Sequence, residues 1–131
     1  PNNVRNLFNR NKMLYEYLPA VLWSAFIFFV CFIPGNDLPK ENWLDKIHFD
    51  KIVHLSLYFI LFLLIVRIPK KKNKKVFLFA ALWCITQGVV IEFIQGTPLI
   101  KNRSFDVLDI AANVVGVIIA LLWINTKHKT N

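Results

Sequence analysis

The sequence predicts an all-α protein, a membrane four-helix bundle. Three observations support this fold class. Of the 131 residues, 56% are hydrophobic and 15% are aromatic, a much larger apolar share than a soluble domain of this length carries. The apolar residues gather into four long stretches, and most of the charged residues lie between or beside them. We therefore expect residues 1–131 to form one transmembrane domain.

The four apolar stretches predict helices over about residues 15–33, 50–68, 75–95 and 105–125. A helix rises ~1.5 Å per residue, so helices of this length can cross a hydrocarbon core ~30 Å thick. The first stretch ends in CFIPG without a small-x-small cleavage pattern. We expect it to be retained as a membrane anchor, not removed as a signal peptide.

The loop between the first two stretches predicts a short helix near residues 40–48. Trp43, Leu44 and Ile47 are spaced at i, i+1 and i+4, which gives a helix one apolar face. Such a helix would lie in the plane of the lipid head groups, with its charged residues in water.

The basic residues are unequally divided between the two sides of a four-span bundle. Eleven of the sixteen fall in the amino terminus, the loop of residues 67–75 and the carboxyl-terminal tail, which share one side. The positive-inside rule therefore predicts a multi-pass protein of the cell membrane with both termini in the cytoplasm. The KKKNKK run should contact anionic lipid. A nucleic-acid partner is not expected, because the basic residues flank membrane segments and form no domain of their own.

Polar residues gather at the opposite ends of the stretches. A charge at the centre of a membrane helix costs about 2.5–3.5 kcal/mol, so polar groups at such depth usually face a protein interior and mark a site. The candidate ligand-binding site has nine residues: Asp50, Lys51, His54, Glu92, Gln95, Arg103, Asp106, Asp109 and Asn113.

Helical spacing places these residues on three facing stripes. The second stretch carries Asp50, His54 and Tyr58 at four-residue intervals, and the third carries Glu92 and Gln95 at i and i+3. In the fourth stretch a polar stripe continues as a stripe of small residues, formed by Asp106, Asp109, Asn113, Gly116 and Ala120. Small residues four apart let helix backbones approach closely in lipid, so this face should point into the bundle.

Three motifs on these stripes resemble the VanZ-like family of small bacterial membrane proteins. They are DKIVH at residues 50–54, IEFIQ at 91–95 and RSFDVLDIAANVVG at 103–116. The family pattern is DKxxH, then ExxQ, then an Arg followed by DxxxN and Gly. Ala120 stands where the family often has a second Gly. The resemblance covers about residues 30–124 and implies an envelope protein, associated in founding members with low-level teicoplanin resistance; it implies no established reaction.

Binding is the function that the site residues favour. Lys51, Arg103 and His54 could hold a phosphate or carboxylate, while the remaining polar groups take hydroxyls and amides. The expected ligand is an anionic or sugar-bearing envelope molecule, such as a lipid-linked cell-wall precursor or a glycopeptide. Membrane lipid is the other expected partner.

Catalysis on lipid-linked precursors is the first alternative. His54 beside Asp50 or Glu92 could act as a general base. The nearest hydroxyls, on Ser56 and Ser104, lie in no nucleophile motif. With one histidine in the set and neither HExxH nor paired-Cys spacing, the sequence predicts no metal and no cofactor.

A purely structural polar network is the second alternative. Lys51 and Arg103 would neutralise neighbouring acids, while Asn113 and Gln95 satisfy the remaining groups and set the helix register. Transport is less favoured, because the sequence shows neither an inverted repeat nor a broken helix.

Overall fold

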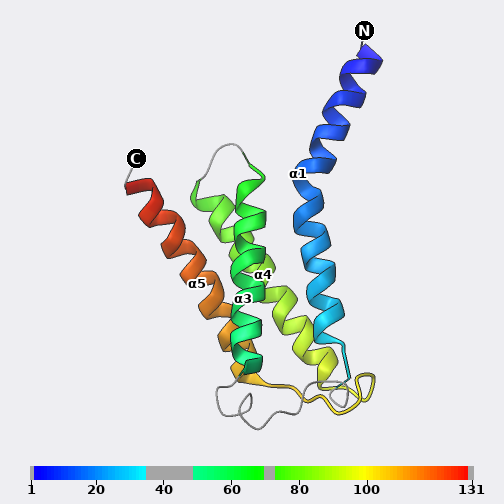
Figure 1. Ribbon diagram of the computed structural model, residues 1–131, viewed down its shortest axis with the longest axis vertical. Coiled ribbons are helices and arrows are strands. Elements are labelled where there is room, and N and C mark those ends of the chain that lie inside the picture. The colour runs from blue at the N-terminus through cyan, green and yellow to red at the C-terminus, as the bar shows by residue number, and fades with distance from the viewer. Residues whose placement is uncertain (1, 35–48, 70–72, 130–131) are drawn as a thin grey trace.

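The computed structural model describes residues 2–34, 49–69 and 73–129. These ranges contain no strand and form four helices: α1 (Asn2–Cys31), α3 (Phe49–Arg67), α4 (Lys74–Gln95) and α5 (Val107–Lys129) (Figure 1). Each helix is long and apolar enough to cross a membrane. The prediction of an all-helical, four-span membrane protein is confirmed. The short helix predicted near residues 40–48 lies outside the described residues.

Two helices have capping residues that explain where they begin. The side chain of Asn73 accepts a hydrogen bond from the backbone N–H of Val76 at the start of α4. Asp106 precedes α5, and its Oδ1 accepts from the backbone N–H of Leu108 at 2.8 Å. Both satisfy N–H groups that a helix leaves without an internal partner. The cap at Asp106 explains why α5 begins at Val107 and not near residue 105.

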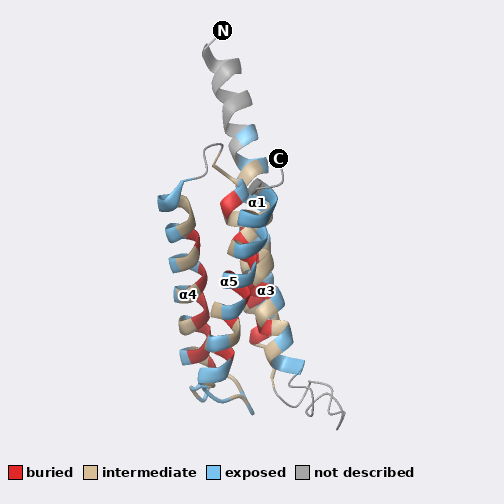
Figure 2. Cartoon of the chain, turned by 90° about the vertical axis from the view of Figure 1, so that its left-hand side faces the viewer, coloured by how far each residue is buried: buried red, intermediate tan, exposed pale blue. Residues whose placement is uncertain are grey.

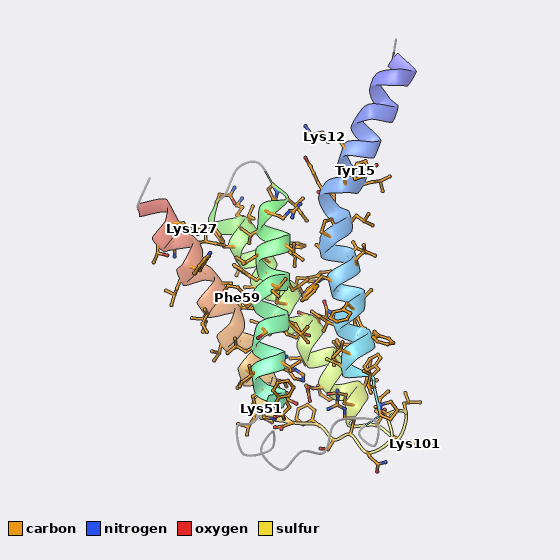
Figure 3. All side chains as sticks on the ribbon, viewed as in Figure 1. Lys12, Tyr15, Lys51, Phe59, Lys101 and Lys127 are labelled. Carbon is orange, nitrogen blue, oxygen red and sulfur yellow. The ribbon has the colours of Figure 1, made fainter. Side chains whose placement is uncertain are left out.

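Helix α1 is longer than predicted, because it begins at Asn2 and not near residue 15. Only Leu14–Cys31 is apolar enough to span a membrane, so apolar pattern alone missed the first part. Extending an existing helix costs far less than nucleating one, which lets α1 continue through a polar segment. Pro19 lies inside α1 and removes one backbone donor; the ribbon changes direction near Tyr15 (Figure 3).

Helix α3 is at the centre of the bundle. It packs against α1, α4 and α5, whereas α1 and α5 do not touch each other within the described chain (Figure 1). Tyr58, Leu61 and Phe62 of α3 are fully buried or nearly so. Figure 2 shows that buried residues form narrow stripes on the helices, with exposed residues facing outward. Many of those outward residues are large and apolar, such as Trp83 and Trp123, which suits contact with lipid tails.

The closest approach of two helices is that of α3 and α5 at Gly116. A Cβ atom at this position would collide with the backbone carbonyl of Leu55 and would lie 3.1 Å from the backbone nitrogen of Phe59. Ala120, one turn further along α5, is fully buried. The close packing predicted from the small-residue stripe is therefore confirmed.

The two chain termini lie at the same end of the bundle (Figure 1). Lys12 and Lys127 also lie toward this end, while Lys51 and Lys101 lie at the other (Figure 3). The residues that carry the predicted site are therefore at the end opposite the termini.

Replacing Gly116 tests the contact between α3 and α5. Gly116→Ala should destabilise the protein by about 1–3 kcal/mol, the usual cost of overpacking, because the new methyl meets backbone that cannot rotate away. Thermal unfolding in detergent measures the effect. Val115→Leu, which adds a methylene at an exposed position, is the control and should leave stability nearly unchanged. Equal unfolding of Gly116→Ala and wild type would contradict the close approach.

Candidate functional site

Seven of the nine predicted residues form one connected group, which we call the polar cluster. Its members come from α3, α4, α5 and the turn before α5: Asp50, Lys51, His54, Glu92, Asp106, Asp109 and Asn113. Figure 3 shows Lys51 at the end of α3 remote from the termini. The other two predicted residues, Gln95 and Arg103, point to different partners.

Lys51 is the centre of the polar cluster. Its Nζ donates to Asp50 at 2.7 Å and to Asp106 and Asp109 at 2.5 Å each. The Lys51 side chain is only 19% exposed, so the three charge-assisted hydrogen bonds are partly shielded from water. The Lys51 ammonium, together with the backbone N–H of Leu108, lowers the pKa of Asp106 below its ordinary value.

His54 lies between Asn113 and Asp109. Its Nδ1 is 3.1 Å from Oδ1 of Asn113, and its Nε2 is 3.6 Å from Oδ2 of Asp109. An amide oxygen only accepts, so Nδ1–H donates to Asn113. Nε2 faces the carboxylate of Asp109, at a distance too long for a hydrogen bond. All three residues are buried.

Glu92 is fully buried, and only one of its oxygens has a hydrogen-bond partner in the described chain. Oε2 accepts from the backbone N–H of Asp106 at 3.0 Å, whereas Oε1 has no partner there. The hydroxyl of Tyr58 and Nδ2 of Asn113 are likewise buried without partners among the described residues. A Cβ at Gly88 would lie 2.6 Å from that Nδ2 and 3.4 Å from that hydroxyl. Gly88 therefore leaves room for both polar groups.

Gln95 and Arg103 join the rest of the bundle to the end of α1. Nε2 of Gln95 donates to the carbonyl of Cys31 at 2.6 Å, and Nε of Arg103 donates to the carbonyl of Ile33 at 3.3 Å. The Cys31 carbonyl is one of those that a helix leaves free at its carboxyl end, and Ile33 follows two residues after α1 ends. Both side chains therefore serve to hold α1 in place.

A second set of polar contacts to α1 was missed by the sequence analysis. Ser24 donates to Oε1 of Gln87 at 2.7 Å, and Nε2 of Gln87 donates back to the Ser24 carbonyl at 3.3 Å. The indole of Trp23 donates to the carbonyl of Leu57 at 2.9 Å. A signal was available, because Gln87 lies eight residues before Gln95, on the same helical stripe.

The polar cluster is acidic. It holds four carboxylates and one ammonium, since the Arg103 guanidinium is directed to the end of α1. Such a group favours cations and hydroxyl donors over a free anion. Of the two hydroxyls considered as nucleophiles, Ser56 is exposed and donates to the Ile52 carbonyl of its own helix at 2.8 Å. Ser104 is also exposed.

Comparisons with known proteins find an uncharacterized relative in fission yeast. The chain is 27% identical over 121 residues to an uncharacterized protein of the fission yeast Schizosaccharomyces pombe, covering 92% of this chain and 67% of that protein. No protein-family model matches the chain, and no solved structure matches it. The fold itself defines the chain as a multi-pass membrane protein with a polar cluster at one end of its bundle. The resemblance to the VanZ-like family stays a prediction.

Removing the Lys51 ammonium tests its role as the centre of the cluster. Lys51→Met should destabilise the protein by about 3 kcal/mol, because breaking a shielded ion pair leaves carboxylates uncompensated. The double variant Lys51→Met/Asp109→Asn should recover part of that loss, since it also removes a buried negative charge. Lys74→Met, at an exposed position on α4, is the matched control. Chemical unfolding in detergent gives the values, and no difference between the two lysine variants would contradict the assignment.

Proposed function

We propose that this chain is a VanZ-like protein of a bacterial cell envelope whose polar cluster binds the sugar-bearing head group of an envelope amphiphile. The three linked motifs support the family assignment. The fission-yeast relative gives the bacterial part no support, so the ligand is named by its chemistry. Glycopeptides of the teicoplanin type fall in the same chemical class, because they join a sugar-bearing head to an acyl tail.

Graded exposure of the polar cluster is the observation that carries this proposal. The side chain of Asp50 is 52% exposed, that of Asp109 is 9% exposed, and Glu92 is fully buried. The cluster therefore has a rim in contact with the surroundings and an inner end covered by protein. Sugar hydroxyls can donate to the carboxylate oxygens of such a rim in charge-assisted hydrogen bonds.

The contacts favour a hydroxylated head group over an anionic one. Lys51 already donates to three carboxylates, and Arg103 donates to the Ile33 carbonyl. The three N–H groups of the Lys51 ammonium are thus all in use, and the Arg103 guanidinium, although it has further N–H donors, is directed to the end of α1 and away from the polar cluster. A hydroxyl needs no cation, because it can donate to the carboxylate oxygens of the exposed rim.

Apolar side chains beside the cluster suit the tail of an amphiphile. Phe49 and Ile52 on the first turn of α3 are about half exposed, and Val107 and Leu108 on the first turn of α5 are more exposed still. These four residues lie within a few positions of Asp50 and Asp106. A ligand with a sugar head and an acyl chain could therefore satisfy polar and apolar surface at once.

Lipid binding tests the proposal directly. Diglucosyl diacylglycerol, added to the full chain in detergent and followed by native mass spectrometry, should bind the wild type more tightly than phosphatidylglycerol with the same acyl chains. Asp50→Asn should weaken glycolipid binding about 10-fold, the effect of losing one charge-assisted hydrogen bond. Glu16 lies on α1, toward the end of the bundle that holds the chain termini, and Glu16→Gln should leave glycolipid affinity unchanged. Equal glycolipid affinity in wild type and Asp50→Asn, or a preference for phosphatidylglycerol, would refute the proposal.

The orientation is part of the proposal and is tested by cysteine labelling. The native cysteines, Cys31 and Cys84, are buried, so an impermeant maleimide should leave them unmodified. Lys101→Cys lies at the end of the polar cluster and should react in intact cells, because that end faces outward. Lys127→Cys should react only after the membrane is permeabilised. The reverse pattern would show that the termini face outward.

A further inference from the structure

We propose that His54, Glu92 and Asp109 form a binding site for one divalent transition-metal ion of the zinc class. Each residue offers one ligand atom, and the three atoms lie within 4.8 Å of one another. All three residues are at most 6% exposed. The inference goes beyond the proposed function and does not depend on it, because ion binding can be measured without any amphiphile.

The imidazole of His54 is oriented as a metal ligand would be. Nδ1–H donates to Asn113, so in the neutral ring the lone pair lies on Nε2, the nitrogen that faces Asp109. Nε2 and Oδ2 of Asp109 are 3.6 Å apart, too far for a hydrogen bond. Two tetrahedral zinc ligands, each ~2.0–2.1 Å from the metal, lie about 3.4 Å apart. The separation is therefore close to that of two ligands of one ion.

A buried oxygen of Glu92 gives independent support for the metal site. Its Oε2 accepts from the backbone N–H of Asp106, while the fully buried Oε1 has no partner among the described residues. A buried carboxylate oxygen in a membrane protein is costly unless a donor or cation meets it. No described side chain supplies one. A metal ion bound with His54 and Asp109 would supply it.

The charge balance separates this site from the acidic group next to it. Oxygens of Asp50, Asp106 and Asp109 also lie within 4.8 Å of one another, but the Lys51 ammonium bridges all three. That second group already has a cation. Asp109 belongs to both groups, because its Oδ1 accepts from Lys51 while its Oδ2 faces His54. In the proposed site Glu92, which has no cation of its own among the described side chains, would together with Asp109 offset the charge of a divalent ion.

The ligand types indicate the class of metal. One imidazole nitrogen and two carboxylates give three protein ligands, the number found at zinc sites that keep an open fourth position. Imidazole suits zinc and its neighbours, whereas magnesium and calcium favour all-oxygen sites. The sequence alone predicted no metal, because a single histidine without a spacing motif carried no such signal. Asn113 would act as a positioning residue through the ring of His54.

Metal content of the 131-residue chain tests the inference. Protein in detergent would be stripped with a chelator, dialysed against buffered Zn²⁺, and analysed for its zinc content; Co²⁺ substitution should give the visible spectrum of a tetrahedral site. We expect one ion per chain. Glu92→Gln should weaken binding at least about 100-fold, and Asn113→Ala, which removes an outer partner, about 10–100-fold. His54→Gln should lose the ion, and His128→Gln is the matched control for histidine.

Three results would overturn the inference: no stoichiometric zinc on the folded wild type, equal zinc on His54→Gln and His128→Gln, or tighter binding of Mg²⁺ than of Zn²⁺. Equal zinc on the two histidine variants would mean an adventitious ion only. The wild-type measurement needs no variant, so a folding defect cannot hide the answer. Glycolipid binding measured in chelator tests the proposed function separately.

Discussion

The three hydrogen bonds of the Lys51 ammonium are the interaction on which the polar end of the bundle depends. They join α3 to α5 through Asp109 and to the turn before α5 through Asp106. Holding Asp106 in place also directs its backbone N–H to Glu92 on α4. One cation thus connects three helices. Because the charges are partly shielded from water, loss of that cation would leave carboxylates with no compensation of similar strength.

The close contact of α3 and α5 makes this arrangement possible. Gly116 brings the two backbones together one turn below Asn113, so the amide of Asn113 can reach His54. Helix α1 is attached differently, through side chains that donate to its carboxyl-terminal carbonyls and through the pair of Ser24 and Gln87. Steric fit therefore holds α3 against α5, whereas individual hydrogen bonds hold α1 against the rest of the bundle.

The polar cluster divides into groups with complete partners and groups without them. Lys51 and its carboxylates satisfy one another, which is what a structural network requires. Glu92 and Asn113, and Tyr58 beside the cluster, each keep a buried polar atom without a partner in the described chain. A purely structural network has no reason to bury such atoms. In the first proposal the exposed rim binds a hydroxylated head group. In the second, the inner group of His54, Glu92 and Asp109 binds a cation. The two proposals therefore concern different depths of one site.

Sequence alone determined the four helices, the end of the bundle that holds the polar residues, and the close approach at Gly116, because each depends on local composition and helical period. Only the tertiary structure decided which polar side chains bond to one another. Spacing places Gln95 on the stripe of Glu92, yet Gln95 bonds to Cys31 on α1. Asp109 shares its two oxygens between Lys51 and His54. Such choices depend on helix rotation and on distances of a few tenths of an ångström, which residue spacing along one helix does not contain.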